Sequence, residues 1–443
     1  MLHPVEGPLP SPERGMQRVE ANAPESLQMA RKVLLFTTVD WLSTARYAQG
    51  FAAASWTVDA LSPKGAPVTF SRYVDAQHRY RALLPLGSLR KTMERARPDL
   101  IVACDDRAVA LLLRLLGKVA ADGEIAGLIR RSLGCPENFP AMISRSESMR
   151  IAGEIGIRAP QTVPVGDAAQ LDACLERLGL PAVLKADGSW GGDGVIVART
   201  RDEAHAAFAR LMRPASRLRN LARAARRKDA HFLIEALRPA KQRVSVQKFV
   251  AGRSAASAFA CWKGEMVAHL HYDVLVADGA IGPPNVVRRV DCEEMEEASR
   301  LVAKRFGLSG IYGLDFIRDA QGNAHLIEIN PRTTQGGTLA FGDGRDMPQA
   351  LAACVTRMPA KRRDAFPSDV VAFFPAEWQR DAASPWLSSG HHNVPWDDPA
   401  VLKHCFDRLP QAQTPDRKAA IERLLASAPA GEERAQSIGC LPI

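Results

Sequence analysis

The sequence predicts a protein in which an α/β domain precedes an α+β region. Short apolar runs alternate with helical segments from Arg31 to about residue 140, the pattern of a parallel sheet covered by helices. From Ser144 onward, strand-like runs follow one another with fewer helices between them, which indicates a mostly antiparallel sheet. A chain of 443 residues is also too long for one ordinary core, so two or three domains in contact are expected.

The first region contains two units in which a strand leads into a helix. Residues 32–38 form a short apolar run suited to a buried parallel strand, and residues 47–54 then show helical spacing. The second strand, at 98–103, ends at Asp105 and Asp106 before a helical stretch at 108–116. This order predicts an α/β domain over residues 31–140.

The second region begins with a helix at 148–155 and includes another at 292–306. Strands are predicted at 182–186, 195–198, 244–250, 256–262, 266–271, 310–318 and 324–330. Beyond about residue 360 the chain is rich in Trp, Pro and Asp, and helical patterning is predicted only over 414–426. The segment 373–395 could cap a site, form a dimer contact or pack as a tail over apolar surface.

Composition excludes several classes of protein. No run of about 18 apolar residues is present to span a bilayer, and residues 1–30 lack the apolar stretch of a secretory signal and are expected to form a mobile arm. The eight cysteines stand singly, so no pair is spaced for a zinc site or a redox dithiol. A reducing cytoplasm is the simplest location for such a protein. The net charge of +9 is concentrated between Arg210 and Arg243, which argues against a general nucleic-acid surface. That segment could recognise an acidic substrate or partner, or be an exposed helical face.

An acidic hairpin carries the first chemical signal. The turn segment 319–323 joins two strand-like runs and contains a glycine suited to a tight turn. A turn at 321–322 places Asp315 opposite Glu328, whereas a turn at 322–323 places it opposite Asn330. Either register puts these three side chains on one face, since side chains alternate along a strand. The opposite, core-facing side is expected to hold Leu314, Phe316, Ile327 and Ile329.

Two opposed carboxylates repel each other unless positive charge lies between them. Hard oxygen ligands of this kind suit magnesium, whose remaining positions are filled by phosphate oxygens and water. The alternative is a solvated hairpin face with a surface ion pair to Arg332, just beyond the second strand.

A glycine-rich segment follows the strand 182–186 and its terminal Lys185. Four glycines fall between residues 188 and 194. Glycines let backbone amides approach an anion, and a strand-end lysine adds a point charge for phosphate. The segment matches neither of the common phosphate-binding glycine motifs, so an ordinary turn is the alternative.

Together these motifs resemble the ATP-grasp superfamily, which includes D-alanine:D-alanine ligase and the large subunit of carbamoyl phosphate synthetase. The resemblance extends over roughly residues 31–359. It implies a Rossmann-like pre-ATP-grasp domain at 31–140, an ATP-grasp domain at 141–360 with a small lid at about 182–250, and a C-terminal extension at 361–443. It also implies ATP and Mg²⁺, or Mn²⁺, as cofactors.

The resemblance assigns the nucleotide contacts as follows. Phosphate would contact Arg145 and Lys185, and the loop over the triphosphate would include Gly191, Gly192 and Gly194. The hinge begins at Gln247, and backbone groups of Lys248 and Val250 would contact adenine. The usual ribose-binding acid is replaced by Ser254, which leaves the sugar contacts open.

The resemblance also implies the chemistry. Asp315, Glu328 and Asn330 would bind metal, while Arg332 and Lys185 would act in catalysis by neutralising developing charge. The implied function is a cytoplasmic ligase that joins a carboxylate and an amine, such as amino acids, through an acyl phosphate, with a homodimer as one assembly. The alternatives are a nonenzymatic nucleotide-binding protein and a carboxylase that uses carboxyphosphate.

Two pairs of residues are candidates for lining the substrate side. Arg288 and Arg289 could grip a carboxylate, or could belong to a surface ion network. His269 and His271 share one face of a predicted strand and could line the site, or could be half-exposed strand residues.

Overall fold

The computed structural model describes residues 31–186, 194–213, 243–279, 282–342, 344–361, 363–408, 421–422 and 424–425. The described residues belong to one compact unit, Arg31–Ile443. Four predictions fall wholly or largely outside them: the arm at 1–30, the loop with Gly191 and Gly192, the basic segment and the helix at 414–426. The domain boundaries at 140 and 360 stay predictions.

A four-stranded parallel sheet opens the described chain, as the sequence predicts. Its strands lie in the order β3-β2-β1-β4, with bounds β1 Lys32–Phe36, β2 Thr57–Ser62, β3 Ala76–Arg79 and β4 Leu100–Ala103. The apolar run of β1 is buried on both faces, because helices cover both sides of such a sheet. These helices are α1 Leu42–Ala53, α2 Pro85–Ala96, α3 Asp106–Leu116 and α4 Glu124–Leu133.

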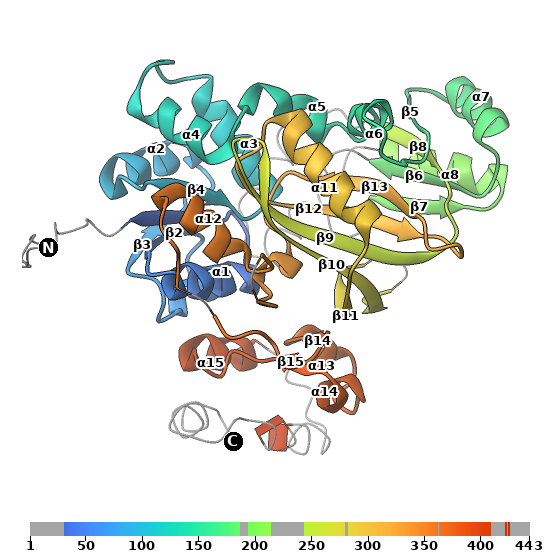
Figure 1. Cartoon of the computed structure of the whole chain (residues 1–443). Coiled ribbons are helices and arrows are strands. Elements are labelled where there is room, and N and C mark those ends of the chain that lie inside the picture. The colour runs from blue at the N-terminus through green and yellow to red at the C-terminus, as the bar shows by residue number, and fades with distance from the viewer. Residues whose placement is uncertain are drawn as a thin grey trace, which may run out of the picture. The chain divides into compact units, whose positions relative to one another are not determined.

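A seven-stranded sheet forms the centre of the second region (Figure 1). Its order is β13-β12-β9-β10-β11-β14-β15, and its neighbours are antiparallel except for the parallel pair β14–β15. The bounds are β9 Arg253–Trp262, β10 Glu265–Ala277, β11 Pro284–Val290, β12 Gly310–Arg318, β13 Ala324–Asn330, β14 Val370–Phe373 and β15 His391–Asn393.

Helices cover both faces of this sheet. The helix α11 (Glu293–Phe306) lies across one face, where Met295, Val302 and Phe306 join the core with Phe259 of β9 (Figure 1). On the other face, α12 (Met347–Thr356) and α1 share a second core with Tyr272 of β10. The alternation of side chains along the strands therefore sorts each residue onto the α11 face or the α12 face.

A smaller antiparallel sheet has the order β5-β8-β6-β7. Its strands are β5 Thr162–Val165, β6 Ala182–Ala186, β7 Val195–Ala198 and β8 Val244–Lys248. Two helices, α7 (Ala168–Leu178) and α8 (Arg201–Met212), bury Leu171 and Phe208 against it. The sheet also includes β5, which lies before residue 182. The start of the lid at about residue 182 stays a prediction. Two shorter helices, α5 (Phe139–Ile143) and α6 (Arg145–Glu154), lie between the parallel sheet and this one along the chain.

The residues after 360 contain more structure than the sequence predicts. The one helix predicted here, 414–426, lies largely outside the described residues. The described part of the segment forms β14, β15 and the helices α13 Ala376–Arg380, α14 Trp386–Ser389 and α15 Pro399–Asp407. These elements are too short for a clear period. Val371 and Phe373 of β14 join the core of the seven-stranded sheet, and Trp378 is buried with Phe406. The segment therefore packs as part of this fold, one of the three roles considered for it.

None of the described helices combines the length and apolar composition needed to cross a bilayer. Short 3-10 turns at Pro67–Phe70, Pro136–Asn138 and Gln335–Thr338 complete the described elements.

Acid should destabilise this fold through β15. Burial, followed by the nearby Arg46, lowers the pKa of His391 from 6.5 to about 4, and burial and His391 do the same for His392. Between these pH values the unfolded chain binds protons that the folded chain does not, so the free energy of unfolding should fall as the pH drops. The free energy of unfolding, measured by chemical denaturation, should fall between pH 7 and pH 4.5. The fall should be smaller in His391→Gln and in His392→Gln than in wild type, by on the order of 1 kcal/mol.

The control is His205→Gln, whose histidine pairs with Asp172 on the small sheet's helices. It should retain the wild-type acid response of β15. An unchanged response in both β15 variants would contradict the assignment.

Candidate functional site

The acidic hairpin pairs its carboxylates as the first of the two predicted registers does, but the predicted turn at 321–322 is wrong: Arg318 lies opposite Ala324, and Asp319 N donates to the Asn323 carbonyl at 3.0 Å. Asp315 lies directly opposite Glu328, and Gly313 lies opposite Asn330. Asn330 Nδ2 donates to Asp315 Oδ2 at 3.0 Å. Two carboxylates and an amide therefore converge, as the alternation of side chains predicts.

A β-bulge sits beside the carboxylates. The register shifts after Asp315, so that Phe316 pairs with Leu326 and Ile327 is the extra residue. The expectation that Ile327 lies in the core is therefore wrong, and Leu326 takes that place. The freed carbonyl of Ile327 accepts from Lys185 Nζ at 3.0 Å and from Gln247 Nε2 at 3.4 Å.

Two cations from separate elements reach this pair. Arg145, the first residue of α6, donates from Nη1 to Glu328 Oε2 at 2.7 Å. Lys185 extends from β6 of the small sheet and is only 3% exposed. Sequence spacing could not bring these residues together, because more than 140 positions separate Lys185 from Ile327.

The groups perturb one another's ionisation. Burial, followed by repulsion from Glu328, raises the pKa of Asp315 from 3.8 to about 6. Burial also disfavours the charged form of Glu328, but Arg145 and Lys185 more than offset it and hold that pKa below its ordinary value. Burial lowers the pKa of Lys185 to about 8. Such shifts are typical of functional sites, where charges are held together out of water.

Arg332 approaches the same carboxylates from the far end of β13. Its Nε donates to Asp106 Oδ2 at 2.9 Å and its Nη1 donates to the Thr333 carbonyl at 3.0 Å. Asp106 begins α3, directly after the N-cap Asp105, which accepts from Ala108 N. The sequence motifs alone assign no role to Asp106. Its position after the carboxyl end of β4 was the available signal, because ligand sites in α/β sheets lie at that edge.

The predicted hinge residues lie beside the small sheet. Gln247 is buried and also donates from Nε2 to Thr162 Oγ1 at 2.9 Å. Lys248 is exposed, and its N–H donates to the Gln161 carbonyl at 2.9 Å. Val250 follows the end of β8. Gly194 accepts from Ala186 N at 2.8 Å and so closes the described end of the glycine loop.

The arginine pair is divided by its strand. Arg289 lies opposite Tyr272 and Arg288 opposite Asp273, so the two point to opposite faces of the sheet. Arg289 is on the α12 face with Asp315, where its Nε donates to Asp369 Oδ1 at 2.7 Å. The expectation that both arginines grip one carboxylate is therefore wrong, because only Arg289 faces the site.

The two histidines also lie away from the site. His271 pairs with Ser257, which pairs in turn with the core residue Leu314, and this row belongs to the α11 face. Tyr272 and Asp315, both beside Ala256, lie on the other face. The hypothesis that His269 and His271 line the site is therefore wrong, since strand alternation sends them to the opposite side.

The carboxylate pair fits a divalent hard cation. Asp315, Glu328 and Asn330 offer oxygen ligands from one hairpin face. A cation there would relieve the repulsion that, together with burial, raises the pKa of Asp315. Arg145 already engages Oε2 of Glu328, so Oε1 would be the oxygen offered to such an ion.

Comparisons with known proteins find similarity in part of the sequence and in the fold. The ATP-grasp domain family matches residues 226–336. Phosphoribosylamine–glycine ligase from Ralstonia nicotianae is 32% identical over 113 residues, which span 26% of this chain and 22% of that protein. The chain thus matches about a fifth of the length of this curated relative.

Solved structures extend the similarity to the fold. The biotin carboxylase domain of Hydrogenobacter thermophilus 2-oxoglutarate carboxylase, in complex with MgADP, ADP and bicarbonate, has a TM-score of 0.53 and 14% identity, covering 76% of this chain and 72% of that one. N5-carboxyaminoimidazole synthase from Aspergillus clavatus, in complex with ADP and 5-aminoimidazole ribonucleotide, has a TM-score of 0.54 and 14% identity. The match covers 74% of this chain and 78% of that one.

Replacing Asp315 should stabilise the metal-free protein. The pKa of Asp315 lies near 6 in the folded protein, above the ordinary 3.8. Ionising Asp315 therefore lowers the free energy of unfolding: the full loss applies above about pH 6, and the stability returns as the pH falls from 6 to 3.8. Asp315→Asn removes this cost and should raise the free energy of unfolding by on the order of 1 kcal/mol at pH 8. Denaturant titration in a metal chelator measures it.

A control of opposite sign lies on the same hairpin. Hydrogen bonds from His325 and Asn323 hold the pKa of Asp319 below its ordinary value, so Asp319→Asn should lose stability at pH 8. A less stable Asp315→Asn protein at pH 8 would refute the predicted charge repulsion.

Proposed function

We propose that this chain, which has the ATP-grasp fold, is a magnesium-dependent ligase that joins a carboxylate to an amine and cleaves ATP to ADP and phosphate. One observation carries the proposal: the carboxylates Asp315 and Glu328 meet Arg145, Lys185 and Arg332 at one end of a hairpin. Phosphoryl transfer depends mainly on positioning and charge neutralisation, and this arrangement supplies both.

The nucleotide would lie between the small sheet and the acidic hairpin. Lys185 and Arg145 would contact its phosphates, with Gly194 and the adjoining Gly191 and Gly192 over the triphosphate. Gln247, Lys248 and Val250 would hold the adenine from the end of β8. The hydrogen bonds of Lys185 and Gln247 to the Ile327 carbonyl support this placement, because they dock the small sheet on the strand that bears Glu328.

Asp315, Glu328 and Asn330 would hold magnesium, or manganese, as oxygen ligands. The bound ion would neutralise negative charge on the phosphate oxygens. Arg145 keeps Glu328 ionised by lowering its pKa, and so preserves a ligand that burial alone would disfavour.

The reaction would proceed in two displacements. A carboxylate oxygen of the substrate attacks the γ-phosphorus; the new O–P bond forms as the β–γ bridging bond breaks and ADP leaves. The amine nitrogen then attacks the acyl carbon, phosphate departs with the C–O bond electrons, and the amine loses a proton. Arg332, held by Asp106, faces the negative charge that develops on the transferring oxygens.

The substrates fit the α12 face of the sheet. Tyr272 lies on that face two strands from Asp315, and Arg289 lies one strand farther along the same row. Arg289 is the candidate for binding a substrate carboxylate. The curated relative is named for joining phosphoribosylamine to glycine, which favours a small carboxylate and an amine, such as amino acids. A homodimer is part of the proposal, as the Hydrogenobacter domain is described as a dimer.

The test is phosphate release from MgATP by the purified protein, against pooled carboxylates and amines. Substrate-dependent release is expected, and Arg332→Ala should lower it about a hundredfold or more, since a cation on the developing charge is lost. Arg300→Ala is the matched control, because this exposed arginine pairs only locally with Glu297 on α11.

The alternatives give different results. Release with bicarbonate and no added amine would replace the ligase with a carboxylase. No phosphate release in any pool, with ATP binding intact, would favour a nonenzymatic nucleotide-binding protein over the ligase. Phosphate release that Arg332→Ala leaves unchanged would contradict the role assigned to Arg332.

Nucleotide affinity should also depend on pH through Lys185. Because its pKa is about 8, the free protein loses this charge between pH 7 and pH 9, so ADP affinity should fall as the pH rises. Lys185→Met should bind ADP at least about tenfold more weakly at pH 7 and lose this part of the pH dependence. Calorimetric titration measures both, with Lys304→Met, an exposed α11 lysine, as control. An unchanged pH profile in Lys185→Met would contradict the phosphate contact.

A further inference from the structure

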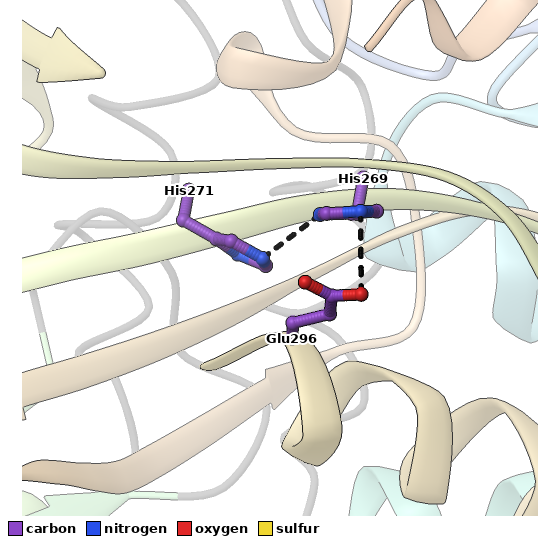
Figure 2. A group of neighbouring side chains, drawn as sticks. All are labelled: His269, His271 and Glu296. Atoms are coloured by element: carbon purple, nitrogen blue, oxygen red, sulfur yellow. Dashed lines mark hydrogen bonds and ion pairs between the residues drawn. The ribbon is translucent and has the colours of Figure 1, made fainter. Parts of the chain in front are cut away.

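Three side chains gather on the α11 face of the seven-stranded sheet, opposite the face with the acidic pair. His269 and His271 of β10 and Glu296 of α11 offer ligand atoms within 4.8 Å of one another. Figure 2 shows the two imidazoles and the carboxylate turned toward one another. His269 Nδ1 lies 3.0 Å from His271 Nε2, and His269 Nε2 lies 3.6 Å from Glu296 Oε1.

His271 is the fixed member of this cluster. It is 3% exposed, and its Nδ1 lies 2.8 Å from the hydroxyl of Ser257, which is itself buried. When Nδ1–H donates to Ser257, the lone pair of Nε2 faces His269. An outer hydrogen bond of this kind orients histidines that bind metal.

His269 and Glu296 complete a set of acceptors around one space. A neutral His269 carries a single N–H, which can donate to the Glu296 carboxylate while its Nδ1 lone pair faces His271 Nε2. With His271 Nδ1–H donated to Ser257, both facing nitrogens would present lone pairs to an ion. The side chains of His269 and Glu296 are 29% and 50% exposed, so an ion can reach them from solvent.

We propose that His269, His271 and Glu296 form a site for a divalent transition-metal ion of the zinc class. Imidazole ligands favour zinc over magnesium, and two histidines with one glutamate leave a position for water. Two nitrogens on tetrahedral zinc lie about 3.3 Å apart, close to the observed 3.0 Å. The carboxylate would have to move inward to reach zinc-ligand distance, which its half-exposed side chain permits.

The ion would join β10 to α11 on the side of the sheet away from the nucleotide. The same helix also holds the acidic hairpin, because Glu294 accepts from Ala324 N at 2.6 Å and from Arg158 Nη1 at 2.7 Å. Metal at this site would therefore stabilise the packing of α11 behind the strands that carry Asp315 and Glu328. The proposal does not rest on the ligase activity.

Cobalt titration of the metal-free, full-length protein tests the site. One equivalent of Co²⁺ should bind with the visible absorption of a low-coordinate nitrogen and oxygen site. His269→Gln and Glu296→Gln should each weaken binding at least about tenfold, whereas the matched controls His205→Gln and Glu293→Gln should not change it. His269 and Glu296 are partly exposed, so these two variants should fold even if His271→Asn, which changes a buried residue, does not.

Thermal unfolding gives a second measurement. Zinc should raise the unfolding midpoint of the wild-type protein and not that of the His269→Gln/Glu296→Gln double variant, and millimolar magnesium should not compete. Equal cobalt binding by the wild type and the double variant would overturn the proposal. A near-ultraviolet thiolate band would also do so, because it would place the ion on cysteines.

Discussion

The site depends on keeping two carboxylates together on adjacent strands. Asp315 and Glu328 are direct cross-strand neighbours, and their charges repel strongly away from water. The protein answers with cations delivered from outside the hairpin rather than by separating the acids. This requirement explains why a helix start, a small sheet and the first α/β region all converge on one hairpin.

Each cation arrives on a different part of the fold. Arg145 comes from the start of α6 and Lys185 from the small sheet, while Arg332 is oriented by Asp106 of α3. The charge balance of the site therefore depends on the packing of these elements against the hairpin. A loss of contact between these elements would leave a buried charge uncompensated, which costs far more than an exposed ion pair.

Much of the strand pattern could be predicted because it depends on local periodicity. Strands 182–186, 195–198, 310–318 and 324–330 have the predicted bounds, and Asp315, Glu328 and Asn330 share a face. The bulge at Ile327 could not be predicted, because it follows from contacts with Lys185 and Gln247 far along the chain. The faces of Arg288 and His271 required the register of neighbouring strands, and the short elements after residue 360 gave no clear period.

The bulge has an evolutionary consequence. The small sheet attaches to β13 through the carbonyl of Ile327, a backbone group that every amino acid possesses. Natural selection can therefore vary the side chain at this position without erasing the attachment. The number of residues between the hairpin turn and Glu328 is constrained instead, because a single deletion would return the strand to regular pairing and withdraw the acceptor. At this point chain length should be under a stricter constraint than the identity of the side chain.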